Sequence, residues 1–291
     1  MMTAAIECLH RQYPGRYETA VETSCNAIFE NNPWVSGFSN FDTIDLAYDL
    51  INQADHRPCH FLQGYVQNLG QQLGIPLECS VRRPYLYLSD DEKSWTNQVE
   101  ETTGYKGKFW LVNAGFKNDY TIKKWTHANW QEVVDALQGE VQFIQIGSSE
   151  HDHRPLKNVI DLVGKTDARQ FIRLAYHAAG ALTPESYLHH VMAAFEKPCV
   201  TLCSGFLPTS WIKYHTGTVL THQEKMSCCV GGKACWKARV VPLSDKDGKD
   251  QCLCHLPVLG DDPVAKCMAM ITPRQVIDAV VGYYEGGRCE K

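Results

Sequence analysis

Three cysteines lie within eight residues of this chain, in the stretch K-M-S-C-C-V-G-G-K-A-C-W from Lys225 to Trp236. Cys252, Cys254 and Cys267 follow, and the whole sequence holds 13 cysteines. Thiolates bind Zn²⁺ and iron tightly, and four of them in a tetrahedral arrangement leave no open position on the metal. The cluster therefore indicates a structural metal centre, although none of its spacings is the C-x₂-C of a zinc ribbon.

Other interpretations of the cysteines stay open. They could be free reduced thiols, or one could act in redox or nucleophilic chemistry, although no C-x-x-C or paired histidine motif supports that role. Disulfides are disfavoured because the start of the chain lacks a basic segment followed by an apolar core, so we expect a cytoplasmic protein. The earlier cysteines are scattered and are expected to behave as small buried hydrophobes: Cys8, Cys25, Cys59 and Cys79.

The composition is that of an ordinary globular protein. With 291 residues, of which 44% are hydrophobic, the chain is long enough for two domains. The net charge is −5 and no Lys/Arg run exceeds two residues, which argues against nucleic acid as a partner. No apolar run approaches the ~18 residues of a membrane span, so none is expected.

The second half of the chain alternates strand and helix patterns. Apolar runs predict strands at residues 108–114, 141–147, around 160, 178–183 and 198–203, and helical periodicity predicts helices at 130–137, 168–177 and 185–195. This alternation is typical of a parallel sheet covered by helices on both faces, so the fold class is α/β and Rossmann-like. A terminal helix is expected at 271–284. The segment 225–270 between has little periodicity and needs something besides an apolar core to hold it.

The first hundred residues give weaker signals. Helices are expected at 3–13, 25–30 and 60–73, and strands at 16–23, 33–38 and 41–46. Acidic residues at the front of 89–104 and the final Gly104 predict a capped helix there. We place the domain boundary at its end, giving domains 1–104 and 105–291.

Four motifs occur in an order that suggests a family. They are W-L-V-N-A-G-F with T-I-K-K-W-T-H-A-N-W-Q-E-V-V, then F-I-Q-I-G-S-S-E, V-I-D-L-V-G-K-T-D-A-R-Q-F-I-R-L and T-P-E-S-Y-L-H-H-V-M-A-A-F-E-K-P-C-V. The chain resembles glycosyltransferase family 9, the ADP-heptose heptosyltransferases and their relatives, from about Trp110 to its end and more loosely before. The resemblance implies a GT-B fold with two Rossmann-like domains, the first for the acceptor and the second for the nucleotide sugar.

The resemblance also implies which residues bind the donor. Lys123, with Lys124 beside it, would pair with the diphosphate and offset charge on the leaving nucleotide. Glu150 would accept the ribose hydroxyls. Thr183, Glu185 and Ser186 would form an anion site at a helix N-terminus, followed by His190 within the helix. Relatives often have Asp where this chain has Glu185. The alternatives are ordinary ones: solvated lysines, a surface acid, a first-turn acid and a helix-face histidine.

A general base is missing from its usual place. Family members open with a strand and a Gly-Asp loop, whereas this chain begins inside the helix that follows. An inverting displacement requires a base near the attacking hydroxyl, and the remaining candidates are Asp42, Asp45 and Asp49. The alternative is a catalytically inactive GT-B homologue that serves as a sugar-nucleotide binding or assembly protein. A Rossmann oxidoreductase is disfavoured because no G-x-G-x-x-G follows a strand.

A subset of the family that modifies autotransporter proteins carries a cysteine-rich insertion holding iron on four thiolates, and K-A-C-W, Q-C-L-C-H-L-P and A-K-C-M-A-M-I-T-P resemble its pieces. The implied ligands of iron or zinc are Cys229, Cys235, Cys254 and Cys267, with Cys228 and Cys252 as near-equal substitutes. The expected partners are a nucleotide-sugar donor, ADP-linked first, and a glycan or protein acceptor. Assembly into a homo-oligomer is left open.

Overall fold

The computed structural model describes residues 1–36, 45–46, 59–96, 98–229, 235 and 238–284. The chain divides into two compact units, Met1–Trp95 with Ser210–Ile212, and Thr96–Thr209 with Lys213–Lys291. The domain boundary at Gly104 stays a prediction. No helix of the described residues is long and apolar enough to cross a lipid bilayer.

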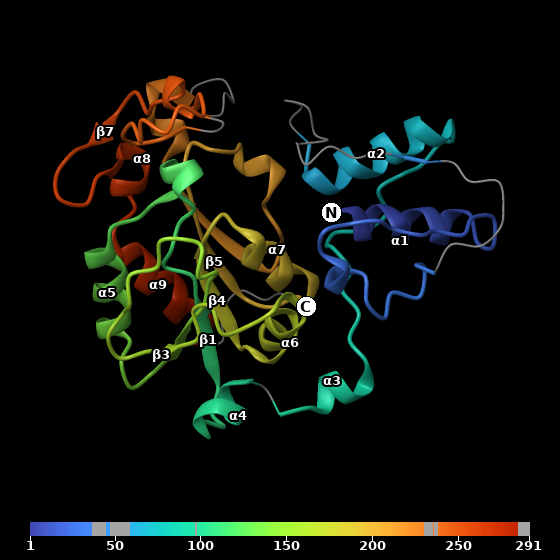
Figure 1. Cartoon of the computed structure of the whole chain (residues 1–291), viewed down its shortest axis with the longest axis horizontal. Coiled ribbons are helices and arrows are strands. Elements are labelled where there is room, and N and C mark those ends of the chain that lie inside the picture. Colours follow the sequence, from blue (N-terminus) through green and yellow to red (C-terminus); the bar gives the residue numbers. More distant parts are fainter. Residues whose placement is uncertain (37–44, 47–58, 97, 230–234, 236–237, 285–291) are drawn as a thin grey trace. The chain divides into compact units, whose positions relative to one another are not determined.

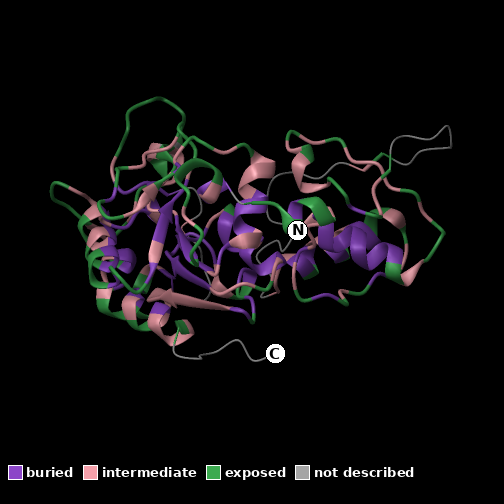
Figure 2. Cartoon of the chain, turned by 90° about the horizontal axis from the view of Figure 1, so that it is seen from below, coloured by how far each residue is buried: buried purple, intermediate pink, exposed green. Residues whose placement is uncertain are grey.

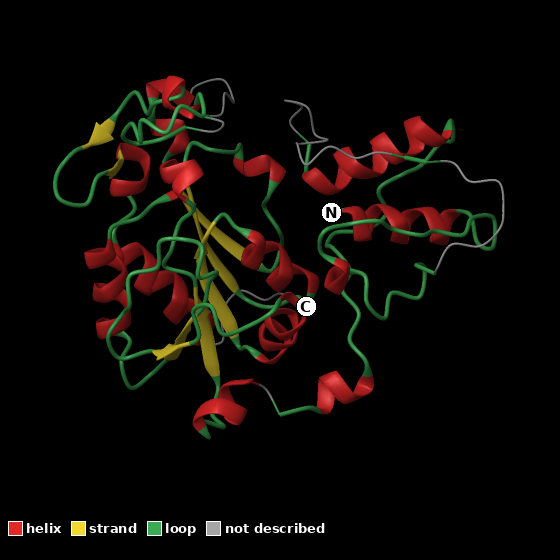
Figure 3. Ribbon diagram, in the orientation of Figure 1, coloured by secondary structure: helices red, strands yellow, loops and turns green. Residues whose placement is uncertain are grey.

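The second unit is built from alternating strands and helices, as predicted (Figures 1 and 3). In chain order its elements are α4 (Gln98–Thr103), β1 (Phe109–Val112), η2 (Asn118–Lys123), α5 (His127–Ala136), β2 (Gln142–Gln145), β3 (Ile160–Asp161), α6 (Ala168–His177), β4 (Gly180–Pro184), α7 (Tyr187–Ala194), β5 (Cys199–Cys203), β6 (Gly217–Thr221), η4 (Gln223–Lys225), η5 (Ser227–Cys229), η6 (Lys249–Gln251), β7 (Pro257–Val258), β8 (Val264–Ala265), α8 (Lys266–Ala269) and α9 (Pro273–Tyr284). The turn η3 (Thr209–Trp211) links the two units.

The strands β1 to β6 form one parallel sheet in the order β3-β2-β1-β4-β5-β6. Residues of β1, β4 and β5 are buried throughout, as expected for strands covered on both faces, and Figure 2 shows these central strands in the buried class. The edge strand β6 is only half-buried along its length, and the sequence analysis did not predict it. The predicted parallel sheet is confirmed.

Helices cover both faces of this sheet. Figure 1 places α5 and α9 on one side of the strands and α6 and α7 on the other. The helix α6 coincides with its predicted range because Asp167 caps it: the carboxylate accepts the N–H of Gln170, whose side chain in turn accepts the N–H of Asp167. The hydroxyl of Thr126 caps α5 in the same way, at the N–H of Asn129.

The described part of the first unit consists of helices and extended chain: α1 (Met2–Gln12), η1 (Asn26–Ile28), α2 (Phe61–Leu73) and α3 (Asp90–Ser94). The helix α1 buries Glu7, whose carboxylate is bonded by Arg11, Trp34 and Tyr87. The strand predicted at 16–23 is wrong, as is the described part of the one at 33–38, because residues 16–23 and 33–36 form turns and irregular chain with a single bridge between Thr19 and Val35. Residues 37–38 lie outside the described residues. The strand predicted at 41–46 lies almost wholly outside the described residues.

The helix predicted at 89–104 is two helices, α3 and α4, because the chain turns to extended backbone at Trp95. Ser89 caps α3 with the expected capping box, accepting the N–H of Glu92. The compact units also divide between Trp95 and Thr96. A single continuous helix could not contain this change of direction.

The segment from η5 to α8 has short elements and a small antiparallel hairpin of β7 and β8. Its most buried charge is Arg239, a fully buried side chain whose guanidinium contacts three carboxylates at 2.7–3.0 Å: Asp245, Asp247 and Asp250. These aspartates come from the loop S-D-K-D-G-K-D. The Arg239 backbone also donates to the carbonyl of Cys252 and accepts from the N–H of Cys254, so the network fixes this part of the cysteine-rich chain.

Candidate functional site

The strand order reverses direction between β1 and β4, and polar residues follow both strands at their carboxyl ends. Ligands of open parallel sheets bind at such a switch point. Asn113 directly follows β1, and its side-chain amide lies 3.5 Å from the hydroxyl of Ser186, which follows β4. The Ser186 hydroxyl also bonds that of Thr183 at 2.8 Å. The sequence analysis named Thr183 and Ser186 but missed Asn113, whose place at a strand end was the available signal.

Ser186 is the N-cap residue of α7, and its side chain makes no capping hydrogen bond. The first N–H groups of an eight-residue helix are thus not satisfied by their cap residue, and they present positive charge toward the switch point. Further along α7, His190 bonds the hydroxyl of Tyr214 at 3.0 Å. The neighbouring His189 is buried and bonds Thr201 at 2.6 Å.

Lys123 and Glu185, 62 residues apart, meet at this edge of the sheet. The Lys123 ammonium donates to the Glu185 backbone carbonyl at 3.2 Å and lies 3.8 Å from the centre of the Phe206 ring, a cation–π contact. Burial lowers the pKa of Lys123, and the negative charge of Glu185 partly offsets this. The structure therefore brings together two of the predicted residues and adds Phe206, which the sequence analysis missed.

The Glu185 carboxyl is 3% exposed. One of its oxygens, Oε1, accepts the hydroxyl of Ser204 at 3.0 Å, while Oε2 has no hydrogen-bond partner among the described residues. Burial raises the pKa of Glu185 to about 6, against the opposing effect of the Lys123 ammonium. This carboxyl can thus change its charge near neutral pH.

Two other predicted residues lie apart from this group. Lys124 is buried and forms an ion pair of 2.6 Å with Asp262, which also accepts the N–H of His127. That pairing favours a structural role for Lys124. Glu150 is exposed on the turn after β2, and among the described residues no hydrogen bond or ion pair joins it to Lys123 or Glu185.

The turn that carries Glu150 brings the ring of His153 against Gly115 and Gly147. A Cβ atom on either glycine would collide with the imidazole, so the close approach requires glycine at both positions. Gly115 follows β1 and Gly147 follows β2. The ring therefore sits beside the carboxyl ends of two neighbouring strands, β1 and β2, of which β1 borders the switch point.

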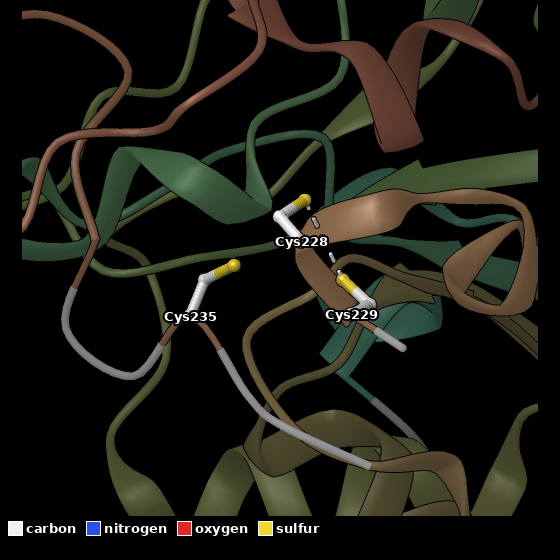
Figure 4. A group of neighbouring side chains, drawn as sticks. All are labelled: Cys228, Cys229 and Cys235. Atoms are coloured by element: carbon white, nitrogen blue, oxygen red, sulfur yellow. Dashed lines mark hydrogen bonds between the residues drawn. The ribbon is translucent and has the colours of Figure 1, made fainter. Parts of the chain in front are cut away.

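The cysteine-rich segment brings thiols together. Figure 4 shows Cys228, Cys229 and Cys235, whose sulfur atoms all lie within 4.8 Å of one another, with 3.9 Å between Cys228 and Cys229. Burial raises the pKa of Cys235, and the charge of Cys228 raises it further. Such thiols repel one another as thiolates, and a cation among them would reverse that repulsion.

Two more thiols belong to the same neighbourhood. Burial raises the pKa of Cys267 to about 11, with the nearby Cys254 and Cys235 adding to the rise. Burial also raises the pKa of Cys254, and the neighbouring backbone at Leu256 and Lys266 acts against the rise. Cys252, one of the substitutes considered, is exposed. The donor set of the segment, a group of neighbouring thiols, fits a structural zinc or iron ion.

Three aspartates are the predicted candidates for a general base. Asp45 is exposed, and Asp42 and Asp49 fall outside the described residues. Their assignment stays a prediction.

Known proteins match this arrangement. The sequence profile of glycosyltransferase family 9 (heptosyltransferase) matches residues 29–234, well over half of the chain. The chain belongs to glycosyltransferase family 9. The expected resemblance is confirmed, and a comparison of this family 9 protein with curated proteins gives no significant match.

Solved structures of the family share the fold. The iron-containing dodecameric glycosyltransferase TibC of enterotoxigenic E. coli H10407 aligns with TM-score 0.59 and 15% identity, covering 97% of this chain and 71% of TibC. The ADP-heptose LPS heptosyltransferase II of E. coli aligns with TM-score 0.52 and 18% identity over 79% of this chain. A family 9 protein of Veillonella parvula DSM 2008 aligns with TM-score 0.51 and 14% identity, covering 95% of this chain and 76% of that one.

These likenesses establish the GT-B fold class for the family 9 chain, with its parallel sheet and its cysteine cluster near the C-terminus. The chain spans 63% of the length of heptosyltransferase II.

Proposed function

We propose that this protein transfers a heptose or a related sugar from a nucleotide-linked donor, ADP-linked in the first instance, to a glycan or protein acceptor by inverting displacement. The observation that carries the proposal is the meeting of Lys123 with Glu185 beside the N-terminus of α7, at the switch point of the sheet. Membership of the heptosyltransferase family supports the reaction class, and heptosyltransferase II, which shares the fold, is named for ADP-heptose.

The roles follow from charge. The donor diphosphate would lie between the Lys123 ammonium and the first N–H groups of α7, next to Thr183 and the hydroxyl of Ser186. Negative charge grows on the leaving nucleotide as the glycosidic bond breaks, and a fixed ammonium stabilises that charge more than it stabilises the bound substrate. Glu150 is proposed to accept ribose hydroxyls, and Asp42 or Asp45 to remove the proton of the acceptor. Lys124 and His190 stay weaker candidates for donor contact.

We also propose a structural metal, iron or zinc, on four thiolates: Cys229, Cys235, Cys254 and Cys267. Cys228 is the alternative to its neighbour Cys229, because the Cys228 sulfur belongs to the same group of three thiols. The ion would supply cross-linking of a segment with few buried apolar residues, and with four thiolates it would contact no substrate.

A panel of nucleotide sugars tests the proposal. ADP-heptose, UDP-glucose, GDP-mannose and ADP-ribose are compared by calorimetric binding, and product mass is measured with glycan and protein acceptors. We expect ADP-heptose to bind and to be turned over. Binding of none of the donors, by protein whose metal content and folding have been checked, would refute the proposed function.

A further inference from the structure

The loop after β5, residues 204–206, lies between the cysteine cluster and the residues proposed to bind the donor. We infer that this loop couples the two sites, so that metal occupancy of the thiols positions Lys123 and Glu185 and thereby sets the affinity for nucleotide. The inference rests on the proposed function, since the donor role of Lys123 and Glu185 is proposed there. It makes Gly205 and Phe206 positioning residues.

Gly205 is the residue of this loop that contacts the thiols. Its carbonyl accepts the N–H of Cys235 at 2.6 Å. A Cβ atom on Gly205 would lie 3.0 Å from the Cys229 sulfur and 3.2 Å from the Cys235 sulfur, closer than ordinary contact. The backbone of Gly205 is therefore packed directly against two of the proposed metal ligands, and a shift of the thiols shifts this residue.

Ser204 and Phe206, the neighbours of Gly205, contact the residues proposed to bind the donor. The Ser204 hydroxyl donates to Glu185 at 3.0 Å and also accepts the N–H of Phe206 at 3.1 Å, which ties the two residues together. The Phe206 ring lies under the Lys123 ammonium at 3.8 Å. Ser204 is fully buried and Phe206 is 5% exposed, so neither can move without its neighbours. One loop of three residues thus touches the thiols and both charged groups.

A second connection reaches Lys123 from the other side. The chain just after Cys235 holds the turn η2, because Ala238 accepts the N–H of Ile122 at 3.4 Å and Val240 donates to the hydroxyl of Thr121 at 2.8 Å. Ala238 in turn donates to the carbonyl of Cys235 at 2.9 Å. Both the backbone that carries Lys123 and the ring beneath its ammonium are therefore attached to residues next to the thiols.

Coupling between two binding sites is reciprocal. If the metal favours the arrangement that binds nucleotide, then nucleotide must favour the metal by the same factor. We expect a factor of about ten, within the range usual for such coupling.

The first experiment measures both directions with the full chain. ADP is titrated calorimetrically into zinc-loaded protein and into protein stripped by a chelator, and the zinc dissociation constant is measured by chelator competition with and without saturating ADP. We expect the Kd for ADP to rise about tenfold on stripping and the Kd for zinc to fall by the same factor with ADP. Equal Kd values for ADP in the two states would overturn the inference.

Variants test the loop itself. Gly205→Ala should lower zinc affinity and ADP affinity together, while the control Gly282→Ala, on α9 where a Cβ meets nothing within 4 Å, should change neither. Phe206→Leu should weaken ADP binding about tenfold with zinc content unchanged, and Phe206→Tyr, which keeps a ring under the ammonium, should restore it. If Phe206→Leu and Phe206→Tyr bind ADP equally, the positioning role of the ring is wrong.

A readout that needs no nucleotide separates this inference from the proposed function. The extent of acetylation of the Lys123 amine is measured by mass spectrometry in zinc-loaded and in stripped protein. It should rise on stripping, while the extent of acetylation of Lys213 stays constant. Absence of ADP binding by the zinc-loaded protein would refute the proposed function, and the labelling would then decide the coupling alone. Unchanged labelling of Lys123 would refute the coupling.

Discussion

The buried carboxyl of Glu185 makes the stability of this protein depend on pH in a way that Glu185→Gln should remove. Burial raises the pKa of Glu185 from its ordinary 4.5 to about 6. The folded state therefore binds this proton more tightly than the unfolded state, so the stability from this group is complete below pH 4.5 and is lost as the pH rises through 6. At 1.36 kcal/mol for each unit of pKa, ionisation of Glu185 costs about 2 kcal/mol above pH 6.

Glutamine keeps the shape of the side chain and its oxygen can still accept the Ser204 hydroxyl, but it carries no charge at any pH. Relative to the wild-type protein, the variant should gain about 2 kcal/mol in free energy of unfolding between pH 4.5 and pH 7.5. Urea unfolding, followed by tryptophan fluorescence at several pH values and at equal metal loading, measures this difference.

Glu150→Gln is the matched control, because it makes the same chemical change at an exposed carboxylate. A difference for Glu185→Gln that is flat with pH, or that falls as the pH rises, would refute the assignment of a buried carboxyl that loses stability on ionisation.

Three further predictions follow from contacts already described. Lys123→Ala should lower turnover by about 100-fold or more with a much smaller change in unfolding, since its ammonium stabilises charge on the leaving group; unchanged turnover at saturating donor would remove the lysine from the mechanism. Protein purified without added metal should contain about one iron or zinc per chain by elemental analysis, and Cys235→Ser should lower both that content and thermal stability; full metal content in the variant would exclude Cys235 as a ligand. Asp262→Ala should destabilise the fold by about 3 kcal/mol in urea unfolding, because it leaves the buried Lys124 ammonium without its partner, whereas Asp278→Ala, on the exposed face of α9, should cost under about 1 kcal/mol; equal effects would show that the Lys124 pair contributes little.

The sheet and its helices could be predicted from sequence because the signals for them, apolar runs and capping residues, are local features of the chain. The run F-W-L-V of β1 is apolar throughout since both faces are covered, and Asp167 marks the start of α6 by its capping chemistry. The strand β6 was missed because G-T-V-L-T lies at an edge of the sheet, where half-burial weakens the apolar signal. The strands predicted at 16–23 and 33–38 were suggested by β-branched and aromatic residues, but β propensity alone does not form a strand, and the described residues there share a single bridge between Thr19 and Val35.

The same distinction between local sequence and tertiary structure applies to the candidate site. Lys123 and Glu185 were predicted from the family resemblance, in loops that follow strands of the sheet, but their contact across 62 residues depends on tertiary structure. Ser204, Gly205 and Phe206 also directly follow a strand, and their position after β5 was the signal that could have found them. The roles of Phe206 and Gly205 could not be predicted from sequence, because one depends on what lies above its ring and the other on what its missing Cβ leaves room for.

The Arg239 network has a practical consequence for work on the metal. An acidic loop such as 245–250 would ordinarily draw a dissolved divalent ion to offset its charge, but here the counter-charge is covalently part of the chain. This arginine counter-charge does not depend on calcium or magnesium in the buffer, and a chelating agent cannot remove it. We therefore expect any loss of structure that a chelator causes in this region to originate at the thiols.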